Sequence, residues 1–415
     1  MRGLYTFIFF LILICSLPFL LPLSLLKGYG LKGRFGILPQ GVKKGGIWLH
    51  GASIGEVGIL ASLAERIKKE SPSLPLSFSA TTQPGLQKVH SLFPEATSFL
   101  LPLDLSPILS KVFNALRPRA LIIAESELWP NLIYEAKRRG CPLFLINARI
   151  SPSSKYRLFK SIFPSLFSSF TRIFCREEKD RSGFEALGVR EERVTLAGEL
   201  KFDRPQNPSL SPKLREDLGI RPEEKVLVAG CTRRGEEERI LKAFFRLNSL
   251  EATLILAPRH LERLEEVERI LRKRRFDYIR RSLVSRRRGE RVILLDTYGE
   301  LSTLYSICYV AFIGGSLEPF GGHNPLEPAS FGVPVIFGPY MEGNPEGTDA
   351  LLKEGGGIMV RDKDELAQVW SRLLRDPQER ERRGESAQKV LVERSGRSAW
   401  VAQTILKEIG IGTRE

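Results

Sequence analysis

The chain contains few of the residues that build metal or disulfide sites. Its 415 residues include only four histidines, and no two of these lie within one helical turn of each other. The five cysteines are far apart and form no C-x-x-C pair: Cys15, Cys141, Cys175, Cys231 and Cys308. This pattern argues against a disulfide framework and a zinc site, and it is typical of a reducing compartment.

Aromatic residues are sparse around the most basic segments. The net charge of +15 implies an acidic partner, which could be nucleic acid, an anionic membrane surface or a phosphorylated substrate. Arginines are dense between positions 272 and 288, but they lack the interleaved aromatic rings on which bases stack. We therefore predict no nucleic-acid partner and interpret these runs as a solvated or membrane-facing surface.

One long segment lacks charge altogether. Residues 3–26 carry no charged side chain and are long enough to cross a bilayer, which needs about 20 apolar residues. Only Arg2 precedes the run, no A-x-A-like cleavage site follows it, and several cations come directly after it. We expect residues 1–26 to be a membrane anchor with the remaining chain in the cytoplasm. Pro18 and Pro22 leave open an embedded anchor that does not fully cross.

Strand and helix patterns alternate along the rest of the chain, which predicts an α/β protein with parallel sheets covered by helices. The first series includes strands at 47–50, 74–79, 120–124 and 143–147, and the second includes strands at 226–229, 253–257, 292–295 and 309–314. The Pro-, Asn- and charge-rich stretch between them is typical of a linker. We expect an N-terminal domain at 27–204, a linker at 205–224, a C-terminal domain at 225–385 and a helical segment at 386–415.

The segment FIGGSLEPFGGHNPLEP resembles a nucleotide cradle. Gly321 and Gly322 allow close approach of the backbone to a ligand, and a helix opening near Asn324 would offer N–H groups to a phosphate. Glu327, one turn into that helix, could accept hydrogen bonds from ribose hydroxyls. The alternative is a glycine-rich turn that only packs.

Carboxylates follow two strands of the first half. Glu56 in WLHGASIGE lies in the first turn of a helix, where it could serve as a general base or could simply stabilise the helix. Glu125 and Glu127 in AESELWPN could orient a sugar or cap the helix near Pro130. Asn147 follows another strand, and Arg149 beside it is suited to a phosphate or carboxylate of a substrate.

The second half offers matching groups after its own strands. Thr232 and Gly235 at a helix start could hold a phosphate, while Pro258 and Arg259 would meet a base or an acidic sugar. Lys201, just before the linker, supplies a further cation. A literal D-x-D at 362–364 precedes a helix start, where Asp364 as helix cap is the stronger explanation, so we assign no metal.

Seven motifs in order resemble the bacterial 3-deoxy-D-manno-octulosonic acid (Kdo) transferases of lipopolysaccharide core assembly: HGASIGE, ESELWPN, NARIS, GELKFD, APRH, DTYGEL and IGGSLEPFGGHNPLEPASFGVPVIFGP. The resemblance covers nearly the whole chain. It implies two Rossmann-like domains facing a cleft in the GT-B arrangement, with the acceptor on the N-terminal domain. It also implies transfer from CMP-Kdo to lipid IVA at the inner membrane, with inversion and with neither metal nor cofactor.

By this resemblance Glu56 is the base that deprotonates the acceptor hydroxyl and Glu127 is a second essential carboxylate. Acceptor contacts are expected from Ser53, Glu125, Asn147 and Arg149. CMP-sugar contacts are expected from Lys201, Thr232, Pro258, Arg259, Gly321, Gly322, Asn324 and Glu327. The chain departs from the family pattern at Cys231 and Arg233, where AGST followed by His is common, and after Gly338.

Two alternatives remain at this point. A UDP-sugar 2-epimerase-like enzyme would have a similar fold, although neither an anchor nor a lipid acceptor would be expected of it. A non-enzymatic, basic, membrane-associated adaptor would bind anionic partners without turnover, and its binding would weaken with salt.

Overall fold

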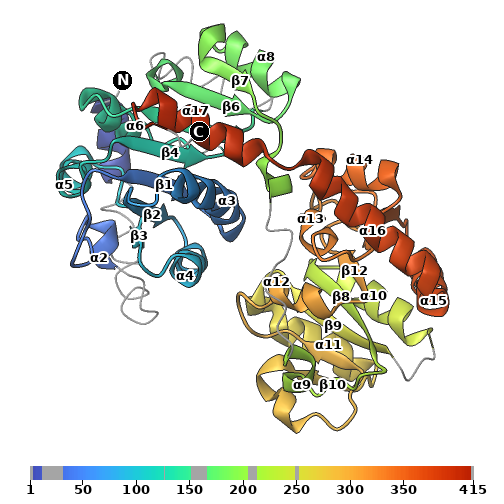
Figure 1. The fold of residues 1–415 in the computed structure, drawn as a ribbon. Coiled ribbons are helices and arrows are strands. Elements are labelled where there is room, and N and C mark those ends of the chain that lie inside the picture. Colours follow the sequence, from blue (N-terminus) through green and yellow to red (C-terminus); the bar gives the residue numbers. More distant parts are fainter. Residues whose placement is uncertain are drawn as a thin grey trace. The chain divides into compact units, whose positions relative to one another are not determined.

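The computed structural model describes residues 3–11, 31–125, 127–150, 166–203, 213–247 and 252–412 (Figure 1). Contacts between residues divide the chain into two units. The first unit comprises Met1–Asp203 and Gly396–Glu415, and the second comprises Arg204–Ser395. Each unit has its own sheet and its own buried core.

The sheet of the first unit is parallel throughout, in the order β3-β2-β1-β4-β5-β6-β7. Its strands are β1 (Ile47–Gly51), β2 (Leu76–Ala80), β3 (Thr97–Leu100), β4 (Ala120–Ala124), β5 (Leu143–Ala148), β6 (Arg172–Cys175) and β7 (Val194–Leu196). Successive residues of β1 enter different cores: Trp48 packs in one cluster, while Ile47 and Leu49 pack in the other. Both faces of the sheet are therefore buried, as parallel sheets require.

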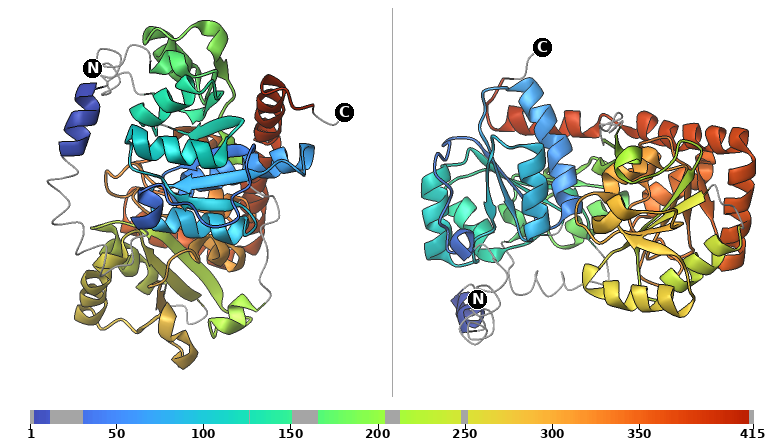
Figure 2. Two further views of the ribbon diagram at one scale, coloured as in Figure 1. Left: turned by 90° about the vertical axis from the view of Figure 1, so that its left-hand side faces the viewer. Right: turned by 90° about the horizontal axis from the view of Figure 1, so that it is seen from below.

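Helices cover the two faces of this sheet (Figure 2). They are α2 (Leu31–Arg34), α3 (Ile54–Glu70), α4 (Gln83–Leu92), α5 (Ser106–Leu116), α6 (Pro130–Arg138), α8 (Glu178–Ala186) and α17 (Arg397–Glu408), with short 3-10 turns η1 (Phe167–Ser169), η2 (Glu191–Arg193) and η3 (Leu200–Asp203). The C-terminal helix α17 packs against α3, where Val401 and Ile405 join the core of the first unit.

The sheet of the second unit is also parallel, in the order β10-β11-β9-β8-β12-β13-β14. Its strands are β8 (Lys225–Thr232), β9 (Ala252–Pro258), β10 (Tyr278–Arg280), β11 (Val292–Leu294), β12 (Val310–Ile313), β13 (Val335–Phe337) and β14 (Gly357–Met359). Its α-helices are α9 (Leu214–Asp217), α10 (Glu236–Phe245), α11 (Leu264–Lys273), α12 (Leu301–Leu304), α13 (Leu326–Ala329), α14 (Pro345–Glu354), α15 (Lys363–Arg375) and α16 (Pro377–Arg394). Its 3-10 turns are η4 (Leu261–Arg263), η5 (Arg281–Arg286) and η6 (Tyr305–Ile307). The predicted pair of parallel α/β domains is confirmed.

Each sheet has one point at which the order of its strands reverses. In the first unit this point lies between β1 and β4, and in the second it lies between β8 and β12. The loops after two such neighbouring strands diverge to opposite faces, which opens a crevice at their carboxyl ends. Ligands of doubly wound sheets bind in that crevice, so the loops after these four strands define where a site should be sought.

The structure divides the chain differently from our expected boundaries at two places. Leu214, Leu218 and Ile220, expected in the linker, are buried in the core of the second unit, while residues 205–212 lie outside the described residues. The expected C-terminal segment from 386 onwards is split, because α16 belongs to the second unit and α17 to the first.

The N-terminal segment is described only in part. Residues 3–11 are helical, and the rest of the expected anchor lies outside the described residues. Among the helices of the described ranges, none is both long enough and apolar enough to span a membrane. The outer face of the 3–11 helix carries five exposed apolar side chains: Leu4, Phe7, Ile8, Phe10 and Leu11.

Candidate active site

The carboxylate of Glu56 folds back onto the start of α3. Ser53 is the N-cap residue, and its Oγ accepts a hydrogen bond from the Glu56 backbone N–H at 3.4 Å. In return Glu56 Oε2 accepts from the Ser53 backbone N–H at 3.1 Å and from that of Ala52. This reciprocal capping box confirms the helix-stabilising interpretation of Glu56. It also fixes the carboxyl group in the loop that follows β1, one of the two strands at the switch point.

A second carboxylate, Glu125, stands directly after β4 in a strained backbone conformation. Its φ is +56°, a left-handed value that is uncommon for residues other than glycine. Its Oε1 lies 3.0 Å from Lys201 Nζ and accepts a hydrogen bond from Asn147 Nδ2 at 3.4 Å. Asn147 is likewise left-handed, with φ +51°. Lys201, expected in the CMP-sugar site, thus pairs with Glu125 in the first unit.

Glu127 follows in the same loop and is held by two aromatic side chains. Trp129 Nε1–H donates to Glu127 Oε2 at 3.0 Å, and His50 Nε2 lies 3.8 Å from the same oxygen. His50 is completely buried near the end of β1. His50 is the first residue of HGASIGE, and although it was not among the predicted site residues, a polar ring inside an otherwise apolar strand is a usable signal.

Glu56, Glu125 and Glu127, with Lys201 as a counterion, form what we call the carboxylate cluster. Burial, followed by the charges of Glu125 and Glu127, raises the pKa of Glu56 to about 7. Burial also acts to raise the pKa of Glu127, but interactions with His50, Trp129 and Thr81 lower it overall. One carboxyl group can therefore take up a proton near neutral pH while its neighbour stays ionised, which is how paired carboxylates divide the acid–base roles.

A buried ion pair between Arg176 and Glu199 contacts the backbone of Lys201, the counterion of this cluster. Arg176 Nη1 donates to Glu199 Oε2 at 2.7 Å, and both side chains are almost inaccessible to solvent. Glu199 Oε1 also accepts from the Lys201 backbone N–H at 3.3 Å, which fixes the residue that pairs with Glu125. The sequence analysis missed both members of this pair. Arg149, in contrast, lies exposed beyond the end of β5.

The second unit gathers cations at its own switch point. Arg233 follows β8, with Nη1 2.5 Å from His260 Nε2, and its Nε–H donates to His323 Nε2 at 3.4 Å. Its guanidinium also lies over the ring of Phe320, 5.4 Å from the centroid. Burial, then the charges of Arg233 and Arg259, lower the pKa of His323 to about 4. We call Arg233, Arg259, His260 and His323 the cationic cluster; its excess of positive charge suits an anion.

The loops around this cluster are held by a buried carboxylate. Glu236 is fully buried and accepts four backbone hydrogen bonds, from Arg233 at 2.8 Å, Gly315 at 2.6 Å, and Ser316 and Leu317 at 2.9 Å each. Consecutive N–H groups of this kind form a nest for anions. A side chain of the protein, Glu236, already fills this nest.

The other residues expected to contact the nucleotide differ in their exposure to solvent. Thr232 is buried with its hydroxyl 3.2 Å from Glu237, and Pro258 is buried at the end of β9, whereas Arg259 is exposed. Gly321 and Gly322 both have positive φ. A Cβ on Gly322 would lie 2.2 Å from Met341 Sδ, which would have to shift, and 3.0 Å from the Tyr340 carbonyl oxygen; with its positive φ, this position favours glycine on structural grounds.

The predicted helix after the glycines is a single turn, α13, which begins at Leu326. Asn324 Oδ1 accepts from the Leu326 backbone N–H at 3.1 Å, while its Nδ2 is buried without a hydrogen-bond partner among the described residues. Glu327 lies in this turn, and its negative charge acts to raise the pKa of both Cys231 and His323.

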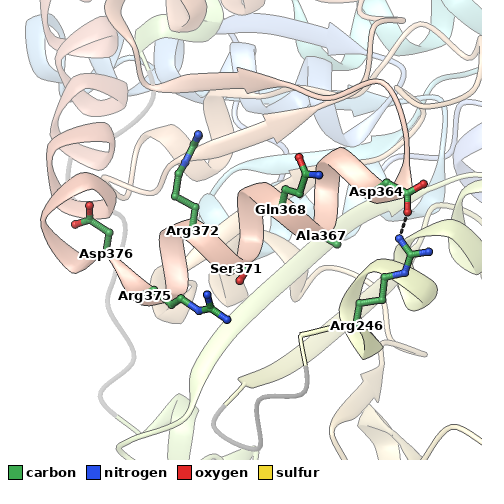
Figure 3. A pocket seen from close by; sticks show the side chains of 8 residues that line it. All are labelled: Arg246, Asp364, Ala367, Gln368, Ser371, Arg372, Arg375 and Asp376. Carbon is green, nitrogen blue, oxygen red and sulfur yellow. Dashed lines mark ion pairs between the residues drawn. The ribbon is translucent and has the colours of Figure 1, made fainter.

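The D-x-D segment belongs to a different surface. Asp362, not Asp364, caps α15, because its side chain accepts from the backbone N–H groups of Asp364 and Glu365. Asp364 forms an ion pair with Arg246 (Figure 3). The groove there has a volume of about 710 Å³ and is lined by Arg246, Asp364, Ala367, Gln368, Ser371, Arg372, Arg375 and Asp376. It contains no residue of either cluster.

Two doubly wound units, each with charged side chains at its switch point, have the architecture of nucleotide-binding α/β enzymes. Residues 29–204 match the family described as "3-Deoxy-D-manno-octulosonic-acid transferase (kdotransferase)", and residues 277–390 match "Glycosyl transferases group 1". The 3-deoxy-D-manno-octulosonic acid transferase of Haemophilus influenzae is 34% identical over 85% of this chain and 84% of that protein. The chain belongs to the Kdo transferase family and is a Kdo-transferring glycosyltransferase.

Solved structures agree on the fold. A glycosyltransferase from Rickettsia africae superposes with a TM-score of 0.61 at 12% identity, over 88% of this chain and 99% of that one. A UDP-GlcNAc 2-epimerase from Neisseria meningitidis gives 0.58 at 15% identity, over 87% and 99%. At such low identity these likenesses establish the two-domain architecture alone.

Proposed function

We propose that the protein transfers Kdo from CMP-Kdo to a hydroxyl of lipid IVA with inversion, and that Glu56 is the general base. The observation that carries this proposal is the raised pKa of Glu56 within the carboxylate cluster. A base is most useful when its pKa lies near the working pH, because it is then both ionised and able to accept a proton.

In the proposed step, an oxygen of the acceptor hydroxyl forms a bond to the anomeric carbon of Kdo. The bond between that carbon and the phosphate oxygen breaks, and CMP leaves with the bonding electrons. The hydroxyl proton passes to Glu56, while Glu127 and Glu125 accept hydrogen bonds from the acceptor. Attack and departure occur on opposite faces of the sugar, which accounts for the inversion.

On the donor side, the cationic cluster stabilises the negative charge that develops on the departing phosphate. Preorganised cations are effective here because they need no reorganisation as the charge appears. Arg233 and Arg259 supply this charge without a divalent ion, and Glu327 accepts hydrogen bonds from ribose hydroxyls. The buried N–H groups of Asn324 Nδ2, unpaired within the described residues, would gain a partner from the nucleotide.

We further propose that the N-terminal segment attaches the protein to the inner membrane, with both units on the cytoplasmic face. The exposed apolar face of the 3–11 helix and the uncharged sequence that follows it support this location. Vesicle flotation checks it: the full chain should float with vesicles of anionic lipids, and Phe7→Asp with Phe10→Asp should reduce the floating fraction. Equal flotation of both proteins would contradict the role of this face.

The decisive experiment follows CMP release from CMP-Kdo with purified protein, detergent-dispersed lipid IVA and excess EDTA. We expect release only when both substrates are present, together with a lipid product heavier by whole Kdo units. Glu56→Gln should reduce turnover by at least about 100-fold, because general bases contribute factors of that order. Glu70→Gln on the same helix is the matched control and should retain full turnover. Undiminished activity of Glu56→Gln would refute the base assignment, and abolition by EDTA would refute the metal-free step.

A further inference from the structure

A histidine inside the first sheet is directed at the carboxylate cluster. His50 is the fourth residue of β1, where it pairs in register with Ser79 on β2 and Ile123 on β4. Its ring is 0% exposed. Nδ1 lies 2.9 Å from Ser79 Oγ and 3.2 Å from Ser79 O, and Nε2 lies 3.8 Å from Glu127 Oε2. Within the described ranges Nε2 has no hydrogen-bond partner, and the carboxylate of Glu127 is the polar group that it faces.

The neighbours of His50 determine which ring nitrogen carries the proton. Trp48 Nε1–H, which can only donate, donates to Ser79 Oγ at 2.8 Å. The single proton of that hydroxyl is then available for an acceptor, and Nδ1 at 2.9 Å fits this role. A neutral imidazole that accepts at Nδ1 carries its proton on Nε2. That proton points toward Glu127.

The opposite tautomer, with the proton on Nδ1, places two hydrogen-bond acceptors next to each other. If Nδ1–H donated to the Ser79 carbonyl oxygen, the lone pair of Nε2 would face the lone pairs of Glu127 Oε2 in a buried site. Two acceptors repel each other unless a proton lies between them. The contacts therefore favour the tautomer that carries its proton on Nε2, facing Glu127.

We propose that His50 is a positioning residue for the transfer reaction, and that it orients Glu127 through the contacts that link Trp48, Ser79, His50 and Glu127. This inference rests on the proposed function. Glu127 in turn is one of the charges that makes Glu56 more basic, alongside Glu125, which is itself paired with Lys201. His50 thus acts on the reaction indirectly, without touching the substrate.

The tautomer can be measured without any turnover assay. The chain has only four histidines, so protein labelled with 15N-histidine should give four resolvable rings, of which His50→Gln removes one. We expect the His50 ring to carry its proton on Nε2 near neutral pH and to change its Nε2 chemical shift in Glu127→Gln. A ring protonated only on Nδ1, or one unaffected by Glu127→Gln, would overturn the proposal even if the protein is an active transferase.

Kinetics provide a second measurement. His50→Gln keeps an N–H that can reach Glu127, whereas His50→Leu is similar in size and has none. We expect His50→Leu to reduce kcat by about 10- to 100-fold, as loss of a hydrogen bond to a charged group does, with the Kd for CMP unchanged. His50→Gln should recover most of this loss, and the control His90→Leu, on the exposed side of α4, should have no effect. Equal losses in the Gln and Leu variants would refute a hydrogen-bonding role.

Discussion

Replacing Glu56 with glutamine should inactivate the enzyme and yet stabilise the first unit above neutral pH. The carboxyl group of Glu56 has a pKa of about 7 in the folded protein, against 4.5 ordinarily. The folded state therefore binds a proton more tightly than the unfolded chain does. Between those two values the unfolded state is more ionised, so stability falls as pH rises.

The size of this effect follows from the shift. About 2.5 pKa units correspond to roughly 3.4 kcal/mol, at about 1.36 kcal/mol per unit. This free energy is the stability that the folded protein loses when Glu56 ionises. The loss is absent below about pH 4.5 and complete above about pH 7. Glutamine avoids this loss because it is neutral, and its carbonyl oxygen can still accept the hydrogen bonds from Ala52 and Ser53 that close the capping box.

The assay compares denaturant unfolding of the wild type and Glu56→Gln at about pH 5 and pH 8. We expect the variant to be more stable by less than about 1 kcal/mol at the lower pH and by roughly 3.3 kcal/mol at the higher one. The kcat of the wild type should rise about tenfold per pH unit below pH 7 and then level off, since only ionised Glu56 is active. A stability difference that does not change with pH would show that the pKa of Glu56 is not raised in the folded protein. Glu56 would then not be a base matched to neutral pH.

Three further outcomes are expected. Glu327→Ala should weaken CMP binding about tenfold by calorimetry, the usual effect of losing one charge-assisted hydrogen bond; an unchanged Kd would contradict its place in the donor site. Asp203→Ala removes the carboxylate that accepts from the Gly396 and Ser398 backbone N–H groups at the start of α17, so the first unit should lose about 1–2 kcal/mol in urea unfolding. Arg176→Met should cost about 3–5 kcal/mol because it leaves Glu199 charged and buried; adding Glu199→Gln should restore part of this, and no restoration would count against the ion pair.

Many elements of the fold depend on short stretches of sequence, so their positions could be predicted. The apolar strands β1, β4 and β5 were located to within a residue or two, because a buried parallel strand is a short apolar run between turn signals. The spacing of Ser53 and Glu56 matches the capping box that the structure contains. Alternation of strands and helices was enough to indicate two doubly wound domains.

Pairings between distant positions could not be read in the same way. Lys201 was expected near the nucleotide, but the chain places it 3.0 Å from Glu125, 76 positions earlier in the sequence. The cap of α15 was also assigned to the wrong aspartate, since the helix begins at Lys363, two residues earlier than a cap at Asp364 implies, and Asp362 is the cap. Such contacts depend on the order of strands in the sheet, which periodicity does not specify.

The sequence by itself determined the class of fold and the family, because strand periodicity, helix caps and ordered motifs are all properties of neighbouring residues. Only the tertiary structure decided that His50 faces Glu127, that Arg176 neutralises Glu199 and that Glu56 holds its proton to near pH 7. Ionisation depends on burial and on charges brought together in space. Those quantities exist only once the sheet has aligned residues that are far apart along the chain.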